Sequence, residues 1–370
     1  MNRPFSVYLD LVRFAAACLV YVWHSNMRML VEDVLPASRY GHSSVIVFFV
    51  LSGFVIAYVT DTKERTWVAY GASRLSRVYS VVLPTLVLTP LLDAAGRAIL
   101  PAMYDYPWDR HVLRLLGCGL MMNESWWVSI TFFSNVPYWS IAFEFWYYAI
   151  FAIATFVPGP WLGWRGAAVL AACVLVGPKI VLLAPVWWAG VLLYRWDWPQ
   201  RRSLAFSWAM FVVSSAGIVL THAVGVYEMT ADWTRDWVGE ARFKELTFAR
   251  YAIGDYLLGL LVFCNFAAMR NVAHQVAPLL LTVERPVKWL AGYTFTLYLL
   301  HQPLFLFWAA VLRGDPSGYG YWWAVTGLTA LSVVAVGAVT EHRRQGLRQA
   351  LQRGLQRLQD RWTARRPARA

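Results

Sequence analysis

Long apolar runs separated by short polar segments cover most of this chain of 370 residues. A helix satisfies its own backbone hydrogen bonds in hydrocarbon, and about twenty apolar residues are enough to cross a bilayer. The pattern therefore predicts an all-α, polytopic membrane bundle of about ten transmembrane helices, of which 185–194 is short enough to be broken or re-entrant. The expected spans lie near 5–24, 43–59, 78–92, 138–156, 167–183, 185–194, 205–224, 251–267, 292–312 and 321–340.

The first run, Pro4 to Ser25, carries Asp10, Arg13 and His24. Asp10 and Arg13 form an i,i+3 pair, and His24 returns to the same helix face about 16 Å beyond Arg13. Ionisable groups are costly in hydrocarbon and usually face a protein interior or a wet cavity. The polar seam therefore indicates either a site or a structural Asp10–Arg13 pair with His24 at the interface.

Composition agrees with a membrane protein, since 59% of the residues are hydrophobic and only 15% are charged. The 21 Trp and 19 Tyr residues are suited to aromatic belts at two interfaces. The four cysteines lie in apolar surroundings and the seven histidines lack ligand spacing, so we expect neither a disulfide framework nor a metal site. The first run has no cleavage site of small residues and is interpreted as a retained helix.

The basic residues favour one orientation. With the N-terminus in the cytoplasm, most of the 33 Lys and Arg fall in cytoplasmic segments, as the positive-inside rule requires, and both termini are cytoplasmic. This placement argues against nucleic acid as the reason for the net charge of +12.

The last segment, 341–370, forms a second region after the membrane domain 1–340. Its Leu347, Leu351, Leu355, Leu358 and Trp362 predict one apolar stripe on a basic helix. Such a helix is typical of binding to an anionic cytoplasmic leaflet, with calmodulin-like or nucleic-acid binding as the alternative.

Two arginines, Arg74 and Arg77, are expected to project from one helix face at the start of the third span. Their guanidinium groups match phosphates, although flanking a membrane span would also explain them. Ser52 lies in a small-residue stretch with Gly53, which allows close approach either of a second helix or of a ligand.

The span that begins near 138 holds Ser140 and a single acidic residue, Glu144. Glu144 is expected either to act as acid/base partner of His24 or to pair with an arginine. In the span that begins near 292, Tyr298 and His301 share a helix face, either as part of a site or with His301 satisfied by a neighbour.

Taken in order, these motifs resemble the membrane acyltransferase family 3. The family includes bacterial O-antigen and exopolysaccharide O-acetyltransferases and macrolide acyltransferases. The resemblance runs from about residue 5 to about 340 and departs from the family at Phe14, where a small residue is usual, and in the basic tail. The motifs that carry it are Arg13-x10-His24, FFVLSGF at 48–54, RLSR at 74–77, WSIAFEFWYY at 139–148 and YTFTLYLLHQPLF at 293–305.

The resemblance implies an O-acyltransferase of the bacterial cytoplasmic (inner) membrane that moves an acyl group, commonly acetyl, from cytoplasmic acyl-CoA to a sugar hydroxyl of a cell-surface polysaccharide or lipid-linked glycan. His24 would be the base or an acyl relay, with Arg13 and Glu144 as its catalytic partners. Arg74 and Arg77 would bind the phosphates of the donor.

The cavity would be completed, again by resemblance, by Asp10, Ser52, Ser140, Tyr298 and His301. Because coenzyme A does not cross hydrocarbon, we expect a continuous tunnel from the cytoplasmic arginines to His24. Two other classes remain open, namely a transporter or flippase without acyl transfer and a ligand receptor without catalysis. Nothing in the sequence indicates the acceptor or the oligomeric state.

Overall fold

The structure, a computed structural model, describes residues 1–27 and 29–364. These residues form α-helices and short 3-10 helices (η). The described residues contain one isolated β-bridge, between Phe132 and Asn135, and no β-sheet. The elements are α1 (Arg3–Ser25), η1 (Ser38–Tyr40), α2 (Gly41–Thr62), α3 (Trp67–Ile99), η2 (Pro101–Met103), α4 (His111–Gly119), η3 (Val136–Tyr138), α5 (Trp139–Phe156), α6 (Trp164–Val176), α7 (Pro178–Arg195), η4 (Trp198–Arg201), α8 (Leu204–Ala223), α9 (Val226–Val238), α10 (Glu240–Glu245), η5 (Thr247–Tyr251), α11 (Ala252–Val272), α12 (Ala277–Thr282), α13 (Glu284–Ala291), α14 (Thr294–Leu312), α15 (Tyr319–Val339) and α16 (Arg344–Ala364).

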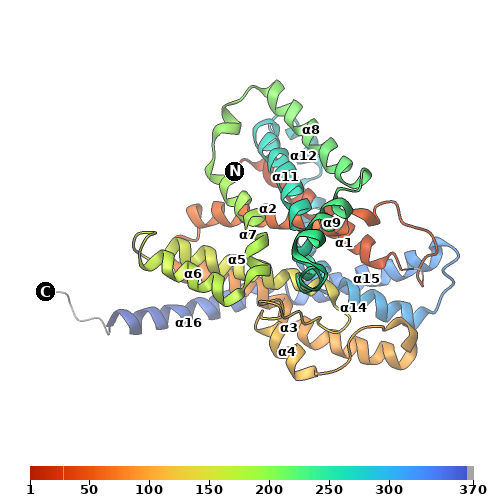
Figure 1. Cartoon of the computed structure of the whole chain (residues 1–370). Helices are drawn as coiled ribbons and strands as arrows, with labels where there is room; N and C mark the ends of the chain where they lie inside the picture. Colours follow the sequence, from red (N-terminus) through yellow and green to blue (C-terminus); the bar gives the residue numbers. More distant parts are fainter. Residues whose placement is uncertain (28, 365–370) are drawn as a thin grey trace.

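Within the described residues, eight helical segments are long and apolar enough to cross a membrane, and each coincides with one predicted span. The all-α polytopic fold is therefore confirmed. The segments are α1, α2 with η1, α3, α5 with η3, α8, α11 with η5, α14 and α15. In the most apolar 18-residue stretch of each segment, 72% of the residues are buried in α2 and in α14, but only 17% are buried in α8. Helices α2 and α14 are therefore among the most enclosed by the rest of the protein, and α8, at the top of Figure 1, turns apolar side chains outward.

The two remaining predicted spans, 167–183 and 185–194, fall on α6 and α7 with a different boundary. The chain breaks at Gly177, whose φ of 85° is left-handed, and Pro178 then begins α7. Helix α6 has only 13 residues, too few for a full crossing at 1.5 Å per residue. Hydropathy does not mark this break because apolar residues lie on both sides of it, whereas the Gly177–Pro178 pair does mark it.

A buried ion pair fixes the start of α7. Lys179 Nζ lies 2.7 Å from Glu124 Oε2, and the two side chains are 0% and 2% exposed. Ser129 also donates to Glu124, at 2.8 Å. Burial nevertheless raises the pKa of Glu124. Removing one partner would leave the other charge buried and uncompensated, so this pair holds the loop before α5 against α7.

A second acidic residue, Glu284, ties α13 to the start of α1. It accepts from Arg3 Nε at 2.9 Å and from Lys288 Nζ at 2.6 Å. These two basic partners lower the pKa of Glu284 to about 2.

Helices α2 and α7 touch through their glycines. A Cβ built on Gly53 would lie 2.0 Å from the Trp187 carbonyl oxygen, and one built on Gly190 would lie 2.0 Å from that of Val50. No side chain fits at either position. Of the two roles expected for the Ser52–Gly53 stretch, the structure shows close helix approach.

The tail forms α16, which extends from the bundle in Figure 1 but contacts α3. Leu347, Leu351 and Leu355 are partly buried, whereas Leu358 is exposed. Leu355 lies against Gly71 of α3. Part of the predicted apolar stripe therefore packs on the protein itself.

Candidate active site

A narrow cavity of about 80 Å³ lies between α1, α2, α3, α5 and α14. Its volume is enough for only a few water molecules. The cavity brings together seven of the ten side chains singled out in the sequence: Arg13, Ser52, Arg74, Arg77, Ser140, Glu144 and Tyr298. Asp10 lines an adjoining cavity, and His24 and His301 line neither.

Glu144 is held by hydroxyl groups rather than by a histidine. Its Oε1 accepts from Ser52 Oγ at 2.7 Å and from the Tyr148 hydroxyl. Ser52 Oγ in turn accepts from Trp187 Nε1 at 3.2 Å. The expected contact between Glu144 and His24 is therefore wrong, because the carboxylate points into the cavity while His24 lies outside its lining. Tyr148 was missed, although its i,i+4 spacing from Glu144 was a usable signal.

The three cavity arginines have different partners. Arg13 donates to Asp10 at 3.0 Å, so the structure contains the predicted i,i+3 pair. Arg74 donates to both Glu64 oxygens, at 2.8 and 2.9 Å. Arg77 has no carboxylate ion-pair partner among the described residues; its guanidinium lies 6.0 Å from the centre of the Phe295 ring.

The predicted equivalence of Arg74 and Arg77 is therefore not seen in the structure. Arg74 is already neutralised by a buried carboxylate that the sequence motif did not reveal, Glu64. Arg77 is the arginine of this pair that forms no ion pair within the described residues, although the carboxylates of Glu144 and Glu341 line the same cavity.

A wider cavity of about 320 Å³ adjoins the first and shares Arg13, Arg77 and Glu341 with it. Its lining adds Asp10 together with basic residues of α13 and α16, including Lys288 and Arg344. Glu341 accepts from the backbone nitrogen and the hydroxyl of Thr296, at 3.2 and 3.0 Å. Burial raises the pKa of Glu341. The narrow cavity therefore opens beside a mouth in which positive charge predominates.

The two candidate histidines form a pair at the far end of α1. His24 Nδ1 lies 2.9 Å from the Val20 carbonyl oxygen and 3.2 Å from His301 Nε2. His301 Nδ1 lies 3.0 Å from the Leu297 carbonyl oxygen. Because carbonyl oxygens only accept, each Nδ1 carries a proton when the rings are neutral. His24 then donates to His301 and keeps an unprotonated Nε2, the form required of a base.

The histidine pair and the cavity are separated by Tyr298. Its hydroxyl lies 2.6 Å from Ser140 Oγ, and both residues line the cavity. The Tyr298 and His301 ring centres are 6.2 Å apart. The expected continuous tunnel to His24 is thus not open in this structure, because these packed side chains close the cavity before it reaches His24.

Membrane-length helices around a charged internal cavity define a polytopic membrane protein with a buried polar site. The sequence model of the Acyltransferase domain family matches residues 6–341, so the chain belongs to this acyltransferase family. The family predicted from the motifs is confirmed.

One similar protein is Acyltransferase MdmB from Streptomyces mycarofaciens, 28% identical over 178 residues. The match covers 45% of this chain and 44% of the relative, so the chain spans less than half of that relative's length. No solved structure matches the chain.

Proposed function

We propose that this membrane acyltransferase transfers an acyl group, acetyl first among the candidates, from acyl-CoA to a hydroxyl of a glycan or glycolipid. The observation that carries the proposal is the cation of Arg77 in a cavity that adjoins a basic mouth. Phosphates of coenzyme A would bind at this mouth through Arg77 and Arg344, which supply charge-assisted hydrogen bonds, whereas Lys288 is already paired with Glu284.

The orientation of the chain follows from the same charges. Lys288, Arg344 and Arg77 all lie at the mouth, and the positive-inside rule favours placing such residues in the cytoplasm. The proposal therefore has both termini in the cytoplasm of a bacterium, the chain in its cytoplasmic membrane, and the donor entering from inside. The His24–His301 pair then lies toward the opposite surface.

In the proposed reaction, His24 Nε2 removes the proton from the acceptor hydroxyl. The hydroxyl oxygen attacks the thioester carbonyl carbon, the new C–O bond forms, and the C–S bond breaks. The coenzyme A thiolate leaves and takes up the proton from His24. General-base assistance of this kind contributes about 10²- to 10⁴-fold to a rate.

The narrow cavity must widen for the donor arm to reach His24. The Ser140–Tyr298 hydrogen bond lies at the obstruction, and its opening would join the cavity to the histidine pair. Glu144, hydrogen-bonded to Ser52 and Tyr148, would orient polar groups along this path.

The test is transfer of label from radiolabelled acetyl-CoA, with longer acyl-CoA donors as further arms, in membranes that contain the full-length chain. Label in an extractable glycan or glycolipid is expected for wild type and lost in His24→Ala and Arg77→Ala. The matched controls are His274→Ala and Arg65→Ala, which change the same residue types at exposed positions. Absence of transfer by folded wild type with every donor would refute the proposal and favour a transporter.

A further inference from the structure

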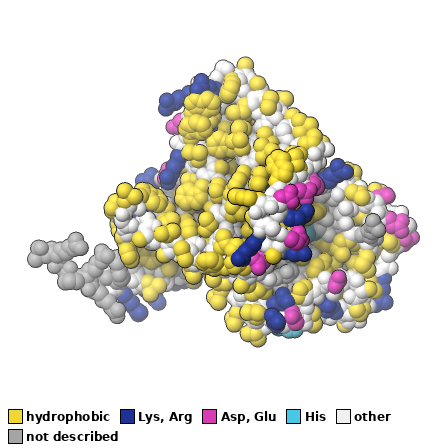
Figure 2. All heavy atoms as spheres, viewed as in Figure 1, with side chains coloured by type: hydrophobic (Ala, Val, Ile, Leu, Met, Phe, Trp, Pro, Cys, Tyr) yellow, Lys and Arg dark blue, Asp and Glu magenta, His cyan; other side chains and the backbone are white. Residues whose placement is uncertain are grey.

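A second, much larger cavity lies at the other end of α1. Its volume is about 920 Å³, and it is lined by Trp23 of α1, His42 of α2, the end of α8, and residues of α9, α10 and η5. Figure 2 shows acidic and basic side chains gathered over α9 and α10 on an otherwise largely apolar face. The cavity shares no lining residue with the cavity of Arg77.

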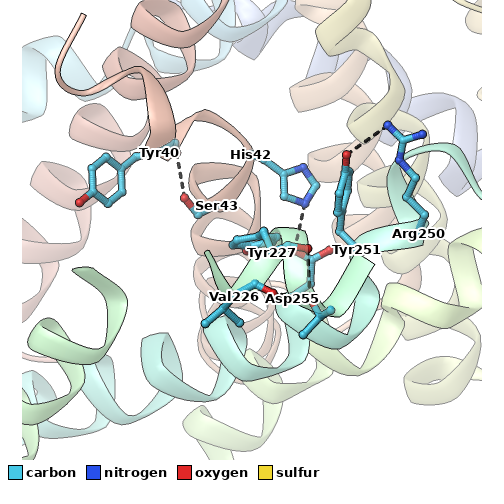
Figure 3. A network of polar contacts seen from close by, with 9 residues as sticks. Tyr40, His42, Ser43, Val226, Tyr227, Arg250, Tyr251 and Asp255 are labelled. Carbon is cyan, nitrogen blue, oxygen red and sulfur yellow. Dashed lines mark hydrogen bonds and ion pairs between the residues drawn. The ribbon is translucent and has the colours of Figure 1, made fainter. Parts of the chain in front are cut away.

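A buried hydrogen-bond network forms one wall of this cavity. His42 Nε2 donates to Asp255 Oδ1 at 3.0 Å, and the Tyr227 hydroxyl donates to the same oxygen at 3.1 Å (Figure 3). Asp255 is 0% exposed, whereas the His42 side chain is 14% exposed and lines the cavity. Since Asp255 holds the proton on Nε2, neutral His42 has Nδ1 as a hydrogen-bond acceptor.

Three buried polar atoms at this place have no partner among the described residues: Asp255 Oδ2, Arg250 Nε and His222 Nε2. Arg250 and His222 line the cavity, and Asp255 lies behind His42. Unpaired buried polar atoms are costly, and those of the two lining residues, Arg250 and His222, indicate that a polar occupant satisfies them.

The lining defines the chemistry of that occupant. The lining offers a donor without a partner among the described residues, Arg250 Nε, and an acceptor, Nδ1 of neutral His42, and a hydroxyl group can satisfy both. Rings such as Trp23, Tyr227 and Tyr251 offer flat apolar faces. The lining carries charges of both signs, which disfavours a strongly anionic or a strongly cationic ligand. The basic residues are Arg39, Arg235 and Arg250, and the acidic ones are Glu228 and Asp232.

The cavity also lies next to the proposed base. Trp23 lines it, and the Trp23 and His24 ring centres are 4.6 Å apart. Trp23 packs against Gly41, the residue before His42. Arg13, at the other cavity, lies about 16 Å along α1 from His24.

We propose that this cavity is the acceptor site and that it binds a polyhydroxylated ring, as in a sugar, with His42 and Arg250 as binding residues and Asp255 as the residue that orients His42. The assignment rests on the proposed acyl transfer. Donor and acceptor then occupy separate cavities at opposite ends of α1, and the acceptor hydroxyl reaches His24 past Trp23.

The experiment measures transfer by the full-length chain in membranes of the source strain from which the chromosomal gene has been deleted. The donor is the acyl-CoA that wild type uses, and the acceptor probe is a titrated glycan and glycolipid extract of that strain. His42→Gln and Arg250→Gln should each raise the half-saturating extract dose at least tenfold. The half-saturating acyl-CoA concentration should stay within twofold of the wild-type value, because these residues do not line the donor cavity.

A third variant, Ala223→Trp, fills the cavity from an exposed position without removing a polar group. It should also raise the half-saturating extract dose at least tenfold. His274→Gln is the matched control, and size-exclusion profiles establish that each variant is folded. The assignment of the acceptor site would be overturned if all three folded variants had the wild-type half-saturating extract dose. It would also be overturned if the half-saturating extract dose and the half-saturating acyl-CoA concentration rose together. No transfer by wild type would instead refute the acyltransferase function and this assignment with it.

Discussion

The His24–His301 pair allows the base to be distinguished from the residue that orients it. In His24→Ala the base itself is lost, so the transfer rate should fall by about 10²- to 10⁴-fold. In His301→Phe the base remains, but the hydrogen bond accepted from His24 Nδ1 at 3.2 Å is lost. A neutral hydrogen bond contributes about 0.5–1.5 kcal/mol net. At about 1.4 kcal/mol per tenfold change, this corresponds to a fall of about 2- to 12-fold.

The assay is the initial rate of label transfer at saturating donor and acceptor, normalised to folded protein. The double variant should match His24→Ala, since His301 is argued to act only through His24. Equal losses in the two single variants would refute this division of roles. A His24→Ala enzyme that keeps more than a tenth of the wild-type rate would refute the assignment of the base.

Three further predictions concern charged groups. Arg77→Gln should raise the KM for acyl-CoA by about 12- to 140-fold, the equivalent of the roughly 1.5–3 kcal/mol of a charged hydrogen bond. Arg74→Gln should raise this KM less, and equal KM values for the two variants in steady-state assays would contradict the prediction. In denaturant titrations, Lys179→Met should lower the free energy of unfolding by about 3–5 kcal/mol, and adding Glu124→Gln should restore part of that loss. A Lys179→Met variant as stable as wild type would show that the pair is dispensable. Because its folded-state pKa is depressed, Glu284 stabilises the fold above its ordinary pKa of 4.5, and this contribution is lost as the pH falls toward about 2. The melting temperature of Glu284→Gln should therefore fall less than that of wild type over this pH range. Parallel plots of melting temperature against pH for the two proteins would exclude this contribution.

The membrane spans were predictable because each apolar run of sufficient length has few ways to satisfy its backbone except as a helix. The break at Gly177 does not show in hydropathy, although the Gly177–Pro178 pair is a local signal for it. Helical spacing also placed Arg13 and Asp10 on the same face correctly. It placed His24 on that face too, but could not show that Tyr298 closes the space between them.

The partners of the site residues were harder to predict than the residues themselves. Glu64 reaches Arg74 across the turn between α2 and α3, where no helical period applies. Asp255 is separated from His42 by 213 positions, so the pairing depends entirely on tertiary packing. Such contacts leave no local pattern in a single sequence.

The glycine contact between α2 and α7 gives the cavity of Arg77 one stiff wall. Backbone atoms meet there without intervening side chains, so neither helix can rotate or slide without a clash. Ser52, next to this contact, is consequently a fixed point, and it holds Glu144 in place. Widening of the cavity therefore depends on its other lining helices, among them α14 with Phe295 and Tyr298. Substitutions at Gly53 or Gly190 should consequently disturb the position of Glu144 even though neither glycine lines the cavity.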